Sequence, residues 1–286
     1  MLVVAALRFS DHRASVDPLS GEARTDPRAA GAGAADLAAL EHALRLRDRL
    51  GGRCVAVTAG PAAADEMLRG ALALGVDEVL RIEGPDPAAT VTEDGSQTAR
   101  LLLAGLAGWA EPPDIVVCGD HSAERGTGAT PAFLAHFLGA AQALGLLELT
   151  AEPDGALRAV RRLDGGRRER LAFSTPAVCS VEPAGTVPRR ASLPATLAAR
   201  RATIPVMNAG SMTIRPGEVK PYRPRPRSLP VPSGTAPHER MLSLTGALTE
   251  RTPPALLTPA TPAEAADALL GYLKEHGYLK EHGYSR

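Results

Sequence analysis

The stretch CVAVTAGPAAADEMLRGALALGVDEVLRIEG, residues 54–84, decides the fold. Its first seven residues are mostly small or β-branched and apolar, and they end at a Gly-Pro pair, which is typical of a buried strand followed by a helix start. The apolar spacing over 62–75 predicts that helix, and residues 77–84 predict a second strand. A strand, a helix and a strand in this order favour two parallel strands in one sheet.

The same alternation continues on both sides of this stretch. Strands are predicted at 2–7 and 114–119, and helices at 96–110, at 130–144 and after Asp36, which is placed as an N-cap. Short buried strands alternating with helices predict an α/β fold with a mostly parallel sheet and helices on both faces.

The pattern changes after residue 144. Residues 146–183 contain Pro-Asp-Gly and Asp-Gly-Gly turns, which predict an antiparallel hairpin extension of the sheet, and the polar residues 11–34 predict a loop or hairpin. Eight prolines over 205–237 predict an extended arm, and Thr261 with Glu264 forms a capping box before a C-terminal helix.

These observations predict two parts of the chain. A nucleotide-binding α/β domain is expected over 1–204, and a Pro-rich arm with a terminal helix over 205–286. We interpret the arm as a segment that embraces a partner, with a disordered tail as the alternative. The tail repeats YLKEHG at 272–277 and 278–283, which is too short for a repeat architecture, and its histidines receive no ligand role.

Charge and cysteine usage exclude several classes of protein. The chain has 32 Lys and Arg against 32 Asp and Glu, so no general attraction to nucleic acid or to anionic membranes is expected. Cys54, Cys118 and Cys179 lack the spacing of a disulfide framework or a zinc site. The first residues do not form a signal peptide, and no apolar run reaches the roughly 18 residues of a membrane span. A cytoplasmic protein without membrane insertion is expected.

Ligands of parallel α/β sheets bind at the carboxyl ends of the strands. The loop after residues 114–118 is rich in Gly, Ser and Thr and precedes a helix, so its N–H groups, hydroxyls and helix dipole suit a phosphate. An ordinary strand-to-helix connection is the alternative. The loop has neither GxGxxG nor GxxxxGK[ST], so the dinucleotide fingerprint and the P-loop are absent.

No catalytic motif is found. The sequence has no GxSxG and no HExxH. The neighbouring Asp120 and His121 are interpreted as a solvated pair, and Cys118 as a small buried residue rather than a nucleophile.

Five segments, in register over residues 1–206, resemble the beta subunit of electron transfer flavoprotein. TAGP (58–61) with ALALGVD (71–77) is similar to the family's Ser-Cys-Gly-Pro and the helix after it. GAADLAALEHALRL (33–46) resembles its Asn-Pro-Phe segment. The Asp-Gly-Gly hairpin at Asp164–Gly166 and the strand at Pro176–Val178 also match, and RASLP (190–194) is similar to Tyr-Ala-Thr-Leu-Pro. The chain most resembles the actinobacterial branch found beside mycofactocin genes.

The resemblance implies an electron carrier subunit rather than an enzyme, with an adenine-nucleotide alpha-hydrolase-like fold. The chain would be half of a heterodimer whose alpha subunit holds the redox FAD. This subunit would hold a structural AMP. Electrons would come from a flavin-type dehydrogenase.

The family's nucleotide contacts fall, by position, on residues at four places in this chain. They are Ala5, Gly33, Ala34, Ala35, Asp36 and Ala59, and in the loop Gly119, Asp120, His121, Ser122, Ala123, Glu124, Arg125, Gly126, Thr127 and Gly128. The resemblance also implies that His12 faces the FAD, and that Leu193 is the anchor leucine that docks the dehydrogenase.

The loop departs from the family pattern. It is two residues shorter, and the family's Asn-Gln-Thr-Gly has become RGTG at 125–128. Two consequences are open. Either backbone N–H groups and Arg125 replace the lost amide side chains as phosphate donors, or the site holds no AMP. Three alternatives remain open: a bifurcating-type beta subunit with a second FAD that uses NADH, a free-standing adenine-nucleotide-binding enzyme of the same superfamily, and a nucleotide-sensing module.

Overall fold

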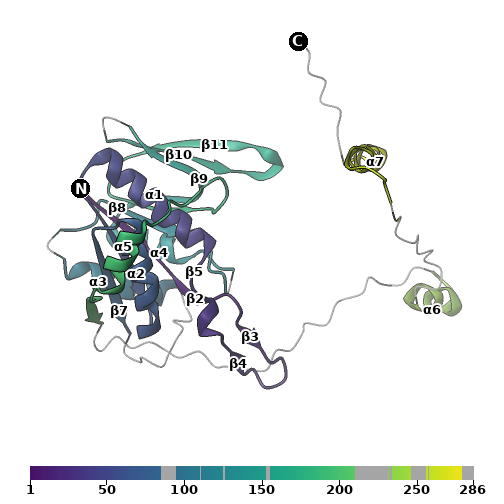
Figure 1. Cartoon of the computed structure of the whole chain (residues 1–286). Coiled ribbons are helices and arrows are strands. Elements are labelled where there is room, and N and C mark those ends of the chain that lie inside the picture. Colours follow the sequence, from purple (N-terminus) through teal and green to yellow (C-terminus); the bar gives the residue numbers. More distant parts are fainter. Residues whose placement is uncertain are drawn as a thin grey trace, which may run out of the picture. The chain divides into compact units, whose positions relative to one another are not determined.

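A computed structural model describes residues 1–84, 95–109, 111–124, 126–152, 155–209, 231, 234–245, 256 and 258–278. The chain divides into two compact units, Met1–Arg223 and Pro224–Arg286. The first unit contains a large twisted sheet covered by helices (Figure 1).

The main sheet of the first unit has the strand order β11-β10-β9-β12-β8-β1-β6-β7-β13 among the described residues. Its strands are β1 (Leu2–Ala6), β6 (Arg53–Ala59), β7 (Glu78–Glu83), β8 (Ile115–Gly119), β9 (Ala141–Ala151), β10 (Leu157–Arg162), β11 (Arg168–Phe173), β12 (Ala177–Val181) and β13 (Val206–Asn208). In this order all pairings from β9 through β13 are parallel, and only the pairings of β10 are antiparallel. The predicted mostly parallel sheet and its hairpin extension are confirmed.

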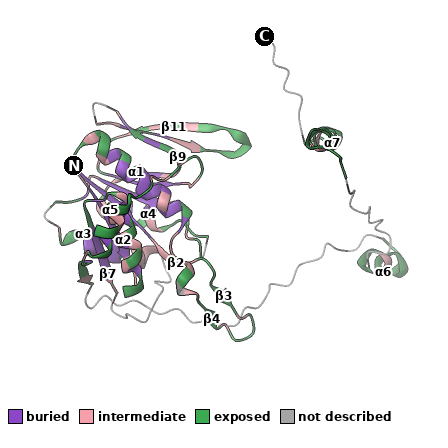
Figure 2. Ribbon diagram, viewed as in Figure 1, coloured by how far each residue is buried: buried purple, intermediate pink, exposed green. Residues whose placement is uncertain are grey.

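Helices cover both faces of the sheet, as predicted. They are α1 (Ala34–Leu50), α2 (Asp65–Leu74), α3 (Gly95–Ala107), α4 (Thr130–Leu138) and α5 (Leu193–Arg200). Successive side chains of β1 alternate between the two faces. Val3 and Ala5 share a core with α1 and α2, whereas Val4 and Ala6 share the other core with α3 and α4. Figure 2 shows the buried residues concentrated in the parallel strands and the helices that pack on them.

Small residues let the helices approach the sheet closely in a chain with only 3% aromatic residues. Gly105 of α3 is an example, because a Cβ placed there would lie 2.2 Å from Cδ1 of Ile82, which is fully buried on β7. The absence of a side chain at this position therefore sets the distance between α3 and the sheet.

Helix α4 is shorter than predicted. It ends at Leu138 because Gly139 adopts a left-handed conformation (φ 60°) as the C-cap. Residues 141–144, which apolar spacing assigns to the helix, instead begin β9. A run of Ala and Leu carries no signal that separates a helix end from a buried strand.

Strand β12 also differs from the prediction. Its sequence lies among the hairpin turns of 146–183, which placed it in the antiparallel extension. The structure inserts it between β8 and β9, parallel to both. All five of its residues are buried, as a central parallel strand requires.

The segment predicted as a loop or hairpin folds as two small antiparallel pairings. β2 (Phe9–Asp11) pairs with β5 (Ala30–Ala32), and β3 (Ser15–Val16) pairs with β4 (Ala23–Arg24). This confirms the hairpin interpretation of residues 11–34.

The second unit contains helices α6 (Pro237–Thr245) and α7 (Pro262–Glu275). The predicted capping box of α7 is confirmed: Thr261 Oγ1 accepts from the N–H of Glu264 at 3.3 Å, and the Glu264 carboxylate accepts from the N–H of Ala260 at 3.0 Å. Most of the predicted arm, including 210–230, and the second YLKEHG copy after Tyr278 lie outside the described residues. No helix in the described ranges is long and apolar enough to cross a membrane.

Two Gly→Ala substitutions in helices test the close approach of α3 to the sheet. Gly105→Ala should lower the free energy of unfolding by about 1–3 kcal/mol, because the new methyl group overpacks against the stiff, β-branched Ile82. Gly70→Ala in α2 is the matched control. A Cβ there meets nothing within 4 Å, so the change should add roughly 0.5–1 kcal/mol by reducing backbone entropy of the unfolded chain. Urea unfolding of both variants measures the difference, and equal stabilisation by both would contradict the packing argument.

Candidate functional site

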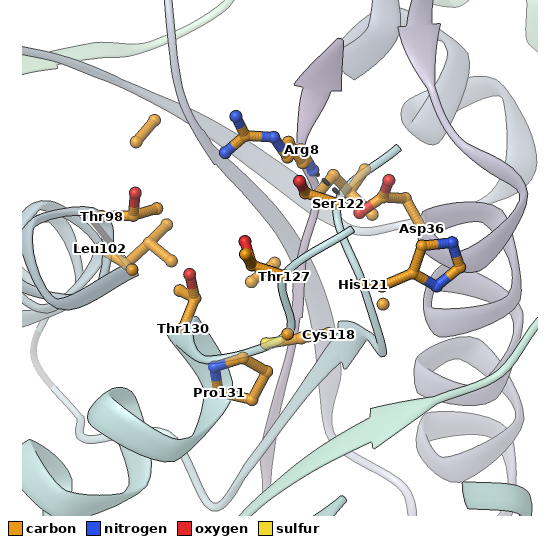
Figure 3. Close-up of a pocket in the computed structure, with 16 residues that line it drawn as sticks. Arg8, Asp36, Thr98, Leu102, Cys118, His121, Ser122, Thr127, Thr130 and Pro131 are labelled. Atoms are coloured by element: carbon orange, nitrogen blue, oxygen red, sulfur yellow. Dashed lines mark hydrogen bonds between the residues drawn. The ribbon is translucent and has the colours of Figure 1, made fainter. Parts of the chain in front are cut away.

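A pocket lies at the switch point of the parallel sheet. From β1 the chain proceeds outward through β6 and β7 on one side, and later through β8 and β12 on the other. The loops that follow β1 and β8 therefore diverge and leave a crevice at the strands' carboxyl ends. The pocket (Figure 3) is lined by Ala6, Leu7, Arg8, Asp36, Ala59, Gly95, Thr98, Leu102, Cys118, Gly119, His121, Ser122, Thr127, Gly128, Thr130 and Pro131.

Asp36 joins the start of α1 to the end of β1. The predicted N-cap role of Asp36 is wrong, because the helix begins earlier and Gly33 is its N-cap. Asp36 lies at the third helical position, from which its carboxylate reaches back. One oxygen accepts from the N–H of Gly33 at 3.1 Å, and the other accepts from the N–H of Arg8 at 3.0 Å.

The Asp36 carboxyl is almost fully buried, and this changes its acidity. Desolvation raises its pKa from the ordinary 3.8 to about 6, while the two N–H groups and the charge of Arg8 oppose that rise. The group is therefore ionised near neutral pH and becomes protonated under mildly acidic conditions.

The loop between β8 and α4 folds back on itself. The N–H of Ser122 donates to the Thr127 carbonyl at 2.9 Å, and the N–H of Gly126 donates to the Ser122 carbonyl at 2.8 Å. A Cβ on Gly128 would lie 2.1 Å from the Asp120 carbonyl oxygen. Only glycine permits this close approach, so Gly128 lets the loop present Ser122 and Thr127 to the pocket.

Helix α4 starts at the pocket. Thr130 is its first residue and lines the pocket together with Thr98, Ser122 and Thr127, so four hydroxyl groups border one cavity. The first turn of an α-helix also directs N–H groups and the positive end of its dipole toward its N-terminus. This set of donors suits an anion.

The structure places the predicted site residues differently with respect to the pocket. Asp36, Ala59, Gly119, His121, Ser122, Thr127 and Gly128 line the pocket, whereas Asp120, Ala123, Glu124 and Gly126 belong to the same loop without lining it. Ala5 is buried within β1, one residue before the lining begins. Arg125 lies outside the described residues.

The N-terminal turn of α1 lies behind the pocket. A Cβ on Gly119 would lie 3.0 Å from the Cβ of Ala35, which shows how closely β8 and α1 pack. A Cβ built on Gly33 would lie 3.6 Å from Cε1 of the His12 ring. His12 does not line the pocket. Gly33, Ala34 and Ala35 do not line it either; they form the start of α1.

Several residues that line the pocket were not singled out from the sequence, among them Arg8, Thr98 and Leu102. Arg8 lies in the segment after the first predicted strand, which the rule that ligands bind at strand ends places at this edge of the sheet. Thr98 and Leu102 come from α3, and no local signal tells which face of that helix borders a pocket.

Other chemistry is not favoured by the described residues. They contain no group of three or more His, Cys, Asp or Glu that could hold a metal ion. Cys118 is buried, and desolvation raises the pKa of its thiol above the ordinary value. The thiol therefore stays protonated, which confirms its interpretation as a small buried residue. His121 forms a polar contact with Asp120 (Nδ1 to Oδ1, 2.7 Å) at a half-exposed position.

A second candidate surface surrounds Leu193. The segment before it is fixed to α1, because Glu41 accepts from both the backbone N–H and the side-chain Nε of Arg189, at 2.9 and 3.0 Å. Ser192 then caps α5 by accepting from Ala195 N–H at 3.3 Å. Leu193 is the first residue of that helix and is 71% exposed. Leu193 is therefore not a core residue.

The fold and the pocket place the chain among the α/β proteins that hold ligands at a switch point of a parallel sheet. The profile of the electron transfer flavoprotein domain matches residues 28–230. A protein of Chromohalobacter salexigens named electron transfer flavoprotein subunit beta is 30% identical over 218 residues, which cover 74% of this chain and 76% of that protein.

Other relatives carry the same name. The human protein is 34% identical over 177 residues, covering 62% of this chain and 68% of its own length. The Mycobacterium bovis protein is 29% identical over 191 residues, covering 63% and 68%. The chain belongs to the electron transfer flavoprotein family. Its similarity is to the beta subunits, so it is an electron carrier subunit rather than an enzyme.

The burial of Asp36 predicts a pH dependence of stability. Its pKa is higher in the folded protein than in the unfolded chain, so its contribution to folding is lost as pH rises from about 4 to about 6. The unfolding free energy of the wild type should therefore fall relative to that of Asp36→Asn, by up to roughly 3 kcal/mol across this window. Denaturant unfolding at several pH values measures the difference.

Asp17→Asn is the control with the opposite sign. Backbone N–H groups of Leu19 and Ser20 lower the pKa of the exposed Asp17. The wild type should therefore gain stability relative to Asp17→Asn as pH rises. If the unfolding free energies of the wild type and of Asp36→Asn change in parallel with pH, burial does not destabilise the Asp36 carboxylate.

Proposed function

We propose that the chain is the beta subunit of a heterodimeric electron transfer flavoprotein. Its alpha partner holds the redox FAD, and this subunit holds a structural AMP in the switch-point pocket. The observation that supports the AMP site best is the convergence of the β8–α4 loop, the α4 N-terminus and Arg8 on one pocket. We also place the protein in the cytoplasm and in the mycofactocin-associated branch. Its three free, buried cysteines are compatible with a reducing compartment.

The residues present fit an adenine nucleotide. The hydroxyls of Ser122, Thr127 and Thr130, together with the guanidinium of Arg8, offer donors to a phosphate. Ala6, Leu7 and Leu102 line the same pocket with apolar surface suited to a base. AMP has no redox group, so its role is to stabilise this end of the sheet and the loops that carry it.

Electron delivery requires a docking surface for the donor dehydrogenase, and we assign it to the segment around Leu193. Two further contacts with α1 help to fix this segment. His42 Nε2 lies 3.0 Å from Thr186 Oγ1, and Arg45 donates to the Val187 carbonyl at 3.3 Å. An exposed leucine on an ordered segment loses little conformational entropy on docking, which suits a binding hot spot.

The second unit is assigned to the alpha subunit. Both α6 and α7 have no buried residue, and they expose large apolar side chains: Met241, Leu244, Leu269, Leu270 and Tyr272. Two helices that expose apolar side chains in this way are well suited to pack on another chain.

Co-expression with an electron transfer flavoprotein alpha subunit from the same organism tests the heterodimer and both cofactors. The purified complex should contain one FAD and one AMP per heterodimer, identified by extraction, absorbance and mass spectrometry. A chain truncated before residue 240 loses α6 from Arg240 onward together with α7, and it should release the alpha subunit.

The possible outcomes separate the alternatives. Two flavins per heterodimer would mean that this subunit binds a second FAD in place of AMP. That result would favour the bifurcating type. ATP turnover by the chain, without any flavoprotein partner, would favour the free-standing enzyme. A truncated chain that still holds the alpha subunit would refute the role of the arm.

Leu193→Ala tests the docking surface. The variant should reduce the kcat/KM for electron transfer from the dehydrogenase that reduces the wild-type complex, about tenfold or more, as expected for a hot-spot residue. Folding and heterodimer assembly should be unchanged because the side chain is exposed. Leu19→Ala, at an 85% exposed leucine in the β3–β4 hairpin, is the matched control and should leave the rate unchanged. Loss of assembly in Leu193→Ala would show instead that this leucine packs against the alpha subunit.

A further inference from the structure

Arg8 reaches across the rim of the pocket. It follows β1, and its Nε donates to Oε2 of Glu124, in the loop after β8, at 3.0 Å, while one Nη contacts the same oxygen. The two side chains are only 26% and 25% exposed. The backbone N–H of Arg8 is fixed by Asp36. The ion pair therefore bridges the two sides of the switch-point crevice.

The pocket presents charges of both signs to an entering ligand. Arg8 is the only Arg or Lys among the described residues that line it, and Asp36 adds a carboxylate to the same pocket. An entering anion thus meets a buried carboxylate and a guanidinium whose charge is already neutralised by Glu124.

We propose that the Arg8–Glu124 ion pair is a latch that the 5′-phosphate of a nucleotide opens. The guanidinium leaves Glu124 and pairs with the phosphate, and the Glu124 carboxylate turns to solvent. This inference rests on the proposed AMP site and adds the residue that recognises its phosphate. In Figure 3 the guanidinium of Arg8 lies above the opening that Thr98, Thr127 and Thr130 border.

The exchange is energetically balanced. The guanidinium passes from one anion to another, so its charge stays paired, and solvent hydrates the released Glu124 carboxylate. The planar guanidinium can form two parallel hydrogen bonds with a phosphate, which are shorter and stronger than neutral ones. A nucleoside without the phosphate gains no such pair and cannot displace Glu124. Pairing of the phosphate with Arg8 therefore makes the site selective for nucleotides over nucleosides, and the competition with Glu124 limits that selectivity.

Binding of AMP and of adenosine to the full-length chain, freed of co-purified nucleotide by dialysis, tests the latch by isothermal titration calorimetry. Arg8→Gln should weaken AMP binding about tenfold or more, as expected for loss of hydrogen bonds to a charged group, and should leave adenosine binding unchanged. Glu124→Gln frees the guanidinium and should strengthen AMP binding several-fold without affecting adenosine. Glu152→Gln is the matched control, because Glu152 pairs with Arg158 at 2.9 Å on the hairpin extension and should change neither affinity.

The outcomes distinguish the latch from the proposed AMP site. If the wild type binds AMP, and Arg8→Gln and Glu124→Gln leave the AMP-to-adenosine affinity ratio unchanged, the latch is wrong while the AMP site stands. If neither the wild type nor Glu124→Gln binds AMP, both are wrong. Binding of AMP by Glu124→Gln but not by the wild type would support a latch that the partner subunit opens.

Discussion

The hydrogen bonds of the buried Asp36 carboxylate set the geometry at the functional end of the sheet. By accepting from the N–H groups of Gly33 and Arg8, this one side chain starts α1 and fixes the chain that leaves β1. Gly119 packs directly against the same helical turn, so β8 and its loop are placed by it as well. Burial of a carboxyl is unfavourable unless its hydrogen bonds are satisfied. Desolvation raises the pKa of this carboxyl. The two hydrogen bonds that oppose this rise also position three elements around one pocket.

Helix α1 connects the pocket to the surface around Leu193. Asp36 lies in its first turn, and Glu41, which accepts from Arg189, lies about 7–8 Å further along the axis at 1.5 Å per residue. The pocket and the proposed docking segment are therefore held by the same 17-residue helix, which packs on the sheet. The proposed nucleotide would thus lie against one end of the helix that fixes the docking segment further along.

The sequence predicts the alternating elements and the hairpin extension because buried strands and amphipathic helices carry distinct periodicities. It misplaces the end of α4 and the position of β12, since strand order and the choice between helix and strand in an Ala-Leu run depend on tertiary packing. The loop after β8 was recognisable from its small residues. Thr98 and Leu102 were not, because their orientation depends on how α3 packs. Arg8 could have been singled out by its place after the first strand, but its pairing with Glu124 is visible only in three dimensions.

The departures of the loop from the family pattern and the presence of the ion pair have a common physical explanation. Neutral amides hold a phosphate through hydrogen bonds and can lie unpaired beside water when the ligand is absent. A partly buried guanidinium cannot remain uncompensated in the same way, because burying a charge without a partner is costly. Replacing amide donors by a cation therefore requires a counterion for the empty site. Glu124, placed in the rewritten loop within reach of Arg8, supplies that charge. In the proposed latch, recognition by charge thus brings a competing intramolecular anion with it, and that competition lowers the affinity for the phosphate.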